Sequence, residues 1–191
     1  MILEKVSDPA ELPVTLHEAK THAKVIGDVE DGLLQMWMEA ATAFCEQSVE
    51  GGISLVSQVW RVTLPAFTTP IVLPRPPLVS VDSITYYDSD DTLQTLDQAE
   101  YKASTPWKQP GCVYPVDQWP ETAARLDAVA VEFTAGYGDK AAVPAIAKSA
   151  ILKTVTELFE QREDSVTGIP SNKTAIGVGR LMHKLAYGYY R

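Results

Sequence analysis

Hydrophobic positions in the first fifty residues recur with the period of an α-helix. Thr15 and Glu18 form a capping box, because each can satisfy the backbone amide of the other. After a polar break, in which Asp28 or Asp31 is the candidate N-cap, a second apolar stripe begins. This stripe consists of Leu33, Leu34, Trp37, Ala40, Ala41, Phe44 and Cys45. Residues 13–50 are therefore expected to be helical, with two successive helices.

From residue 53 to residue 138 apolar and polar positions alternate instead, which is typical of β-strands. Trp60, Val62 and Leu64 share one face of the segment QVWRVTLP. In LVSVDSITYY alternate residues are expected on opposite faces of the strand. One face has Val79, Val81, Ser83 and Thr85, and the other has Ser80, Asp82, Ile84 and Tyr86. PIVLP and AVAVEFTAGYG are two further strands, and the proline- and aromatic-rich STPWKQPGCVYPVDQWPE between them is expected to be an ordered loop.

Helical periodicity returns at residues 143–163, which open with Pro144 in the first turn, where a missing amide costs nothing. The remaining residues, 164–191, are expected to form a loop and a short terminal helix. The order helices, strands, helices predicts an α+β fold. In it a helical core, made of the N-terminal two helices and the C-terminal helices, carries a β-rich insertion between the second and third helices. At 191 residues the chain is expected to form a single domain.

Composition and charge narrow the possible functions. The net charge of −9, with scattered Lys and Arg, argues against tight nucleic-acid binding, which needs clustered cations. No run of 18 apolar residues predicts a membrane-spanning helix, and no signal peptide is expected at the N-terminus. The two cysteines, Cys45 and Cys112, make no disulfide framework, which favours a reducing cytoplasm.

The acid-rich stretch YYDSDDTLQTL does not match a calcium-binding motif. Counted from Asp88, a helix–loop–helix calcium site needs glycine at position six and glutamate at position twelve, but Leu93 and Ala99 occupy those positions. Asp88, Asp90 and Asp91 are therefore interpreted as the polar tip of a hairpin, because Asp favours turns.

No other pattern predicts catalysis or a cofactor. His17 and His22 are five residues apart, which points them in different directions on a helix, and His183 has no companion ligand. Neither cysteine lies in a nucleophile context, and the glycines of TAGYG and GVGR lack the spacing of a phosphate-binding loop. We expect no catalytic, metal-binding or cofactor-binding residues.

The terminal segment RLMHKLAYGYYR places leucines, a methionine and three tyrosines in the last dozen residues. Such a segment can pack on its own core or anchor another protein, and the residues alone leave both alternatives open. The segment LPRPP is interpreted as a rigid bend between two strands rather than as a polyproline ligand.

Taken in order, these segments resemble the head–tail connector family of tailed phages, also called adaptor or head-completion proteins and found in prophages and gene-transfer particles. The resemblance covers residues 14–191. It rests on the ordered set TLHEAKTHAKVIGDVEDGLLQMWMEAATAFCEQ, QVWRVTLPAF, IVLPRPPLVSVDSITYYDSDD, VEFTAGYG, VPAIAKSAILKTVTELFEQRED and the tyrosine- and arginine-containing tail. Its most specific part is LPRPPLVSVDSITYYD followed by FTAGYG.

The resemblance implies a structural protein without enzymatic activity. It implies a homo-oligomeric ring of twelve copies under the portal protein, a stopper or tail-completion protein on the other side, and DNA passing through the channel without specific binding. Assembly in the bacterial host cytoplasm and a place in the virion neck, with no membrane, are also implied. Residues 164–191 become the partner-binding tail, in which Leu181, Leu185, Tyr189 and Tyr190 are the candidate portal contacts.

Two alternatives remain open at this point. One is another structural part of a phage, a tail-completion or tail-terminator protein. The other is a small soluble α+β enzyme or ligand-binding module.

Overall fold

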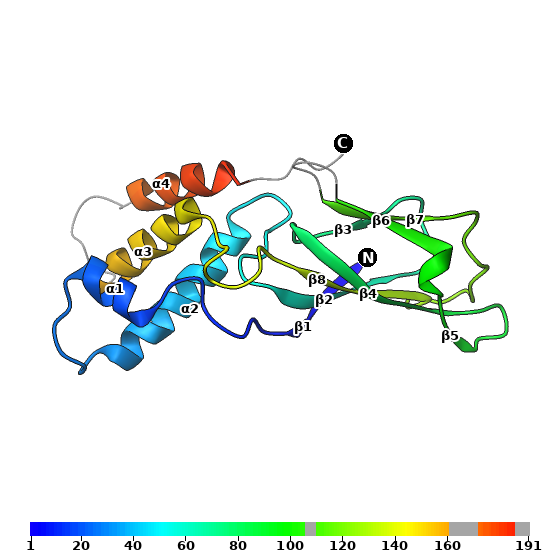
Figure 1. Cartoon of the computed structure of the whole chain (residues 1–191), viewed down its shortest axis with the longest axis horizontal. Helices are drawn as coiled ribbons and strands as arrows, with labels where there is room; N and C mark the ends of the chain where they lie inside the picture. Colours follow the sequence, from blue (N-terminus) through cyan, green and yellow to red (C-terminus); the bar gives the residue numbers. More distant parts are fainter. Residues whose placement is uncertain (106–109, 161–171, 186–191) are drawn as a thin grey trace. The chain divides into compact units, whose positions relative to one another are not determined.

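A computed structural model of the chain describes residues 1–105, 110–160 and 172–185 (Figure 1). Within them the chain divides into two compact units. The strand unit comprises Met1–Ala10 and Ser57–Tyr137, and the helical unit comprises Glu11–Val56 with the described part of Gly138–Ala186. The α+β class is confirmed, whereas the single domain divided at 13–50, 53–138, 143–163 and 164–191 stays a prediction.

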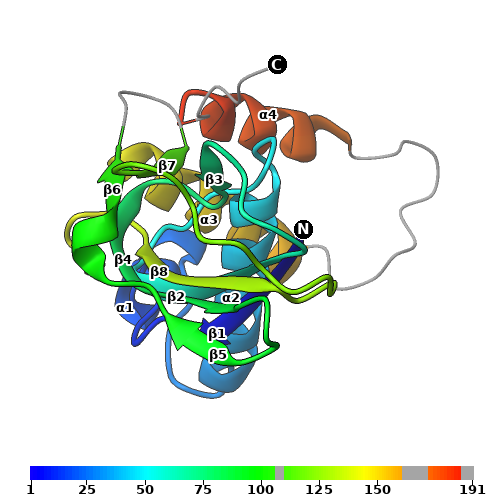
Figure 2. The ribbon, with the colours of Figure 1, turned by 90° about the vertical axis from the view of Figure 1, so that its right-hand side faces the viewer.

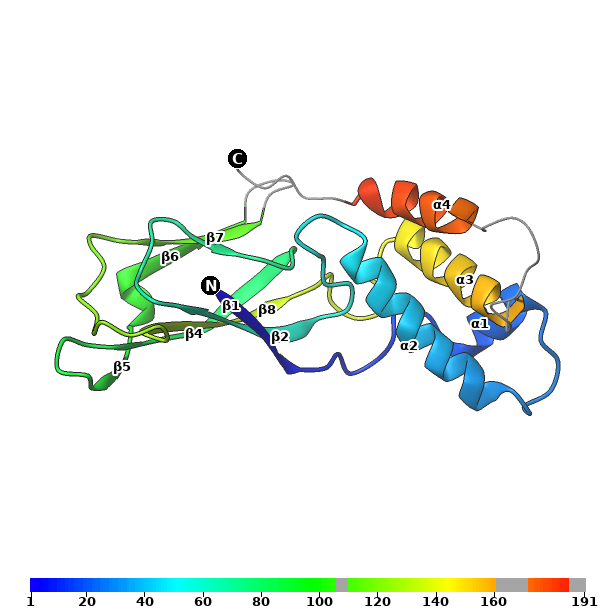
Figure 3. The same cartoon turned by 180° about the vertical axis from the view of Figure 1, so that it is seen from behind.

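The helical unit contains the four α-helices of the described residues, and α2 and α4 both pack on α3 (Figures 1 and 3). The helices are α1 (Leu16–Ala23), α2 (Asp31–Gln47), α3 (Ala145–Glu160) and α4 (Asn172–His183). The capping box is confirmed: the Thr15 amide donates to the Glu18 carboxylate at 2.6 Å, and the Glu18 amide donates to the Thr15 hydroxyl at 3.2 Å. Neither Asp28 nor Asp31 caps α2; Glu30 holds that position, without a side-chain cap.

Only part of the apolar stripe expected on α2 is buried. Leu34, Ala41 and Cys45 are buried as expected, but Ala40 and Phe44 are exposed. The rest of the buried side consists of Met38, Thr42 and Glu46. Polar Thr42 and Glu46 fit there because the Thr42 hydroxyl donates to the Met38 carbonyl at 2.7 Å and the Glu46 carboxylate accepts from the Leu55 amide at 2.9 Å.

The strand unit is a sandwich of two antiparallel sheets that lie one over the other (Figure 2). The larger sheet has the order β1-β2-β8-β4-β5, with β1 (Ile2–Ser7), β2 (Gln58–Leu64), β8 (Val129–Ala135), β4 (Leu78–Tyr87) and β5 (Leu93–Thr95). The smaller has the order β3-β7-β6, with β3 (Ile71–Leu73), β7 (Gly111–Pro115) and β6 (Tyr101–Ser104) after the 3₁₀ turn Gln98–Glu100.

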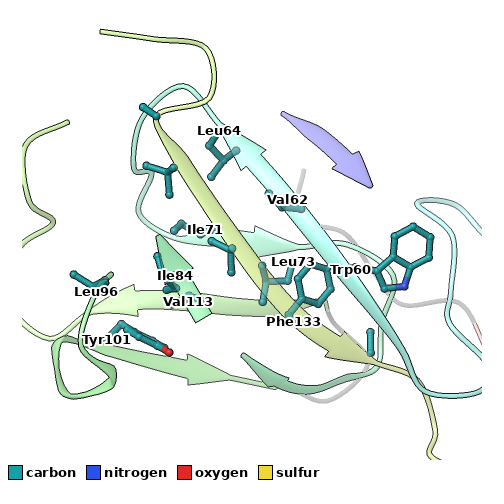
Figure 4. Packing of buried hydrophobic residues seen from close by; sticks show 14 residues of the cluster. Trp60, Val62, Leu64, Ile71, Leu73, Ile84, Leu96, Tyr101, Val113 and Phe133 are labelled. Carbon is teal, nitrogen blue, oxygen red and sulfur yellow. The ribbon is translucent and has the colours of Figure 1, made fainter. Parts of the chain in front are cut away.

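Alternate residues of the strands fill the space between the sheets. Trp60, Val62 and Leu64 of β2 are buried as expected, in one cluster with Phe133 of β8 and Ile71 of β3 (Figure 4). Burying such large apolar side chains stabilises the sandwich by about 1.5–3 kcal/mol each. The segment LPRPP connects β3 of the smaller sheet to β4 of the larger one, so its interpretation as a bend between strands is confirmed.

Three expectations for this unit were wrong or incomplete. The expected faces of β4 fail, because irregularities between Leu78 and Ser80 and between Val81 and Ser83 shift its register on β8. Leu78, Val81 and Ile84, three residues apart, consequently share the core side. Part of the expected loop STPWKQPGCVYPVDQWPE is β7, which pairs with both β3 and β6. Strand β1 was not predicted.

Candidate partner-binding site

The aspartates of the β4–β5 hairpin stabilise its turn. The Asp88 carboxylate accepts hydrogen bonds from the amides of Asp90 and Thr92, both at 3.0 Å, and from the Gln94 side chain at 2.8 Å. The Thr92 amide, followed by the Gln94 side chain, lowers the pKa of Asp88, because these donors stabilise the ionised carboxylate. The hairpin-tip interpretation is thereby confirmed.

Arg125, from the segment before β8, fixes the same tip. Its guanidinium donates to Asp91 at 2.8 Å and to both carboxylate oxygens of Asp127 at 2.7 and 2.8 Å. It also lies 3.5 Å from the centre of the Tyr87 ring, within the range of a cation–π contact. Asp91 and Asp127 are thus occupied by an arginine rather than left to converge on a metal ion.

The remaining candidate groups are separate from one another. His22 of α1 contacts the Thr156 hydroxyl of α3 at 2.7 Å, while His17 and His183 are exposed. Cys45 is buried, and desolvation raises the pKa of its thiol to about 12, so the reactive thiolate is not populated at neutral pH. Within residues 1–105, 110–160 and 172–185, no three His, Cys, Asp or Glu side chains are grouped to hold a metal ion.

The end of α4 carries the described part of the expected partner-binding tail. Val178 and Met182 are buried and anchor α4 to the helical unit. Leu181 and Leu185 are half-buried, and the Leu185 amide donates to the Met182 carbonyl at 2.8 Å in a turn that closes the helix. Tyr189 and Tyr190, the other candidate contacts, lie outside the described residues. The structure therefore tests no contact with a portal.

Sequence reasoning missed a different apolar surface, on the side of α2 that faces away from the other helices. Met36 is 54% exposed and Phe44 is 44% exposed, and Ala40 and Ala43 lie between them. In the preceding loop Ile26 and Val29 are almost wholly exposed. The signal in the sequence was an α2 that is apolar on two sides, where an ordinary surface helix has one apolar face. In the described part of the chain, no helix is both long and apolar enough to cross a membrane.

Solved structures share this fold along the whole chain. A chain in the neck of an empty GTA particle, computed with C6 symmetry, has a TM-score of 0.81 and 20% sequence identity, covering 100% of this chain and 98% of that one. The chain has the fold of a phage-like neck protein. A chain in the virion of a native gene transfer agent (GTA) particle gives the same values, with a TM-score of 0.81 at 20% identity.

A third chain of this neck fold, from the neck of a native GTA particle computed with C12 symmetry, has a TM-score of 0.77 at 20% identity and again covers 100% of this chain. No family model matches the chain, and no curated protein matches it by sequence. At this identity the similarity establishes the fold.

Proposed function

We propose that this chain is a structural head–tail connector subunit of a tailed phage or prophage. Copies form a ring under the portal, join the DNA-filled head to the tail or stopper, and leave a channel for DNA. The observation that supports this most strongly is the neck fold, which extends over 100% of the chain and 98% of the matched chain.

A ring of identical subunits requires two different surfaces on each copy, one that meets the preceding copy and one that meets the next. The structures of similar fold were computed with C6 and C12 symmetry, which supports a ring, and the number we propose is twelve. The role is structural rather than catalytic. This agrees with the separated titratable groups and with the two aspartates that Arg125 occupies.

The net charge of −9 suits a channel that DNA passes without binding. Acidic side chains repel the phosphate backbone within a Debye length, about 8 Å at physiological ionic strength. The particle would be assembled in the host cytoplasm and the subunit would remain in the virion neck, between the portal and a stopper or tail-completion protein.

The C-terminal segment is the proposed portal anchor. Leu181 and Leu185 are half-buried where α4 ends, and Tyr189 and Tyr190 follow four and five residues after Leu185 in the sequence. Aromatic side chains near a chain terminus are effective anchors, because each offers a large contact area at a small cost in side-chain entropy.

The test is a truncation that removes residues 186–191. The cut is placed there because a cut at residue 180 would also remove Met182, which is fully buried in the helical unit. We expect the truncated chain to keep its circular dichroism spectrum and to lose co-sedimentation with portal particles. Full-length chain should appear as a ring on the portal in negative-stain images.

A matched pair of variants separates the anchor from general surface effects. Tyr190→Ala should weaken portal binding, while Tyr114→Ala, at a tyrosine of β7 that is 38% exposed, should leave it unchanged. Unchanged co-sedimentation of the truncated chain would contradict the anchor. A full-length chain that binds portal without forming a ring would contradict the connector itself.

A further inference from the structure

We propose that the outward face of α2 in one copy binds the outward face of α4 in a second copy of this chain. The inference names the subunit contact of the ring, and in that respect it rests on the proposed function. The α2 outward face consists of Met36, Ala40, Ala43, Phe44 and Gln47. The α4 outward face consists of Gly177, Arg180, His183 and Lys184.

The first observation is that α2 is apolar on the side that its own unit leaves uncovered. Leu34, Met38 and Cys45 are buried and mark the inward side. At 100° per residue, Met36, Ala40 and Ala43 lie opposite them. Figure 3 shows this helix with α1, α3 and α4 on its other sides. Since Met36 and Phe44 are large, exposed and on one face, they form a surface typical of a protein contact.

The second observation is that the shape of this face suits another helix. Leu33, Met36, Ala40 and Ala43 follow one another at spacings of three, four and three residues, the spacing of a coiled-coil seam. The alanines let a second backbone approach closely. Gly32, on the same side, has open space where a Cβ would stand, with no atom of the described residues within 4 Å of it.

The third observation is the charge around the face. The chain has no Lys or Arg between Lys24 and Arg61, so α2 has only acidic charges of its own. At its N-terminal end Lys20 of α1 pairs with Asp28 at 2.8 Å and with Asp31 at 2.7 Å. Glu39 is exposed, and the last turn of α2 has no basic residue of its own, while the helix dipole adds negative potential there. A partner helix with exposed cations would complement this end.

Helix α4 offers both features that complement the α2 outward face, namely exposed cations and room for a neighbouring helix. No Asp or Glu occurs after Asp164, and Arg180, His183 and Lys184 are all exposed. Gly177, one turn before Arg180, also has open space where a Cβ would stand, so it leaves room for a neighbouring helix. Val178 and Met182, on the opposite side of α4, are buried in the core of its own unit.

The two faces cannot meet within one copy. Both helices pack their buried sides on α3, so both outward faces point away from the helical unit (Figures 1 and 3). A contact between two different faces of identical copies is heterologous, and its repetition closes a ring or extends a filament. The proposed contact therefore has the symmetry that a connector ring requires.

The decisive experiment uses two charge-introducing variants of the full-length chain. Met36→Asp damages only the α2 face, and Arg180→Asp damages only the α4 face. Each alone should raise the concentration needed for self-association by about tenfold or more in sedimentation velocity. Leu126→Asp, at a leucine of the strand unit that is 84% exposed, is the matched control and should associate like the unmodified chain.

Mixing the two variants distinguishes this contact from any other. The intact α2 face of the Arg180→Asp chain can still bind the intact α4 face of the Met36→Asp chain, but neither complex can grow further. Native mass spectrometry should therefore show a one-to-one heterodimer and nothing larger. A mixture that remains monomeric where the unmodified chain associates would overturn the proposal.

Engineered cysteines test the same contact inside an assembled ring. Because Cys45 and Cys112 are buried, they give no background. A chain carrying both Ala40→Cys and Lys184→Cys should give an oxidised ladder of dimers, trimers and larger species. A ring visible on the portal without this ladder would overturn the contact and leave the connector function standing. A ladder without any binding to the portal would support the contact and contradict the connector function.

Discussion

Replacing Gly111 by alanine tests how closely the two sheets of the strand unit pack. Gly111 is buried at the start of β7, where it pairs with Leu73 of β3. An added Cβ would lie 2.6 Å from the Cβ of Leu78 and 3.0 Å from its Cγ. Carbon atoms in favourable contact are about 3.5–4.0 Å apart, so β4 and β7 would have to separate by roughly 1 Å.

The size of the effect follows from which atoms collide. A side chain can rotate away from a clash with its far end, but the Cβ of Leu78 is fixed by its own backbone. Extra atoms in a well-packed core usually cost about 1–3 kcal/mol, and the upper half of that range is expected where backbone has to move. We therefore expect Gly111→Ala to lower the free energy of unfolding by about 2–3 kcal/mol.

Urea denaturation followed by tryptophan fluorescence measures this loss, and hydrogen exchange should place it in β4 and β7. Gly32→Ala is the matched control, because nothing lies within 4 Å of the added Cβ and the position is helical. Alanine in a helix is favoured over glycine by about 0.5–1 kcal/mol, so this control should be slightly stabilising. An unchanged midpoint for Gly111→Ala would refute the close approach of the two strands.

Three further outcomes are expected. Thr15→Ala removes the N-cap of α1 and should cost the helical unit about 1 kcal/mol in thermal or urea unfolding. Hydrogen bonds from the amide and then the hydroxyl of Thr15 lower the pKa of Glu18 below its usual 4.5. The stabilisation from the ionised Glu18 is therefore present above pH 4.5 and is lost as the pH falls through the lowered pKa. Glu18→Gln should flatten this part of a stability–pH curve. Asp88, Asp90 and Asp91 changed together to Asn should leave portal binding intact and the melting temperature insensitive to EDTA, whereas a chelator-dependent loss would revive a metal site.

The elements that sequence could predict are those in which local chemistry and periodicity agree. The capping box at Thr15 and Glu18 marks the start of α1, and the alternation around Trp60 and Phe133 marks two central strands buried on one side. In both cases the signal lies within a few residues of the element itself. The order of elements, and with it the α+β class, followed from these local signals.

The errors arise where structure depends on distant residues. The irregular pairing of β4 with β8 brings Leu78, Val81 and Ile84 to one side, and no two-residue period can express a spacing of three. Strand β7 packs closely on Leu78 because position 111 is a glycine, and Leu78 lies far away in the sequence. The prolines of the segment that contains β7 predicted a loop, because proline removes a ladder hydrogen bond.

The interaction surfaces illustrate the same limit in a different way. Periodicity placed Ala40 and Phe44 of α2 in the core, because both are apolar and lie at helical spacing from residues that are buried. A helix that contacts its own unit on one side and a neighbouring subunit on the other has apolar residues on both, so its sequence cannot indicate which side is internal. In the proposed ring, the blurred periodicity of α2 is itself the sign of a second partner. In the proposed contact the charges of the two helices agree, because α2 is acidic and the exposed face of α4 is basic.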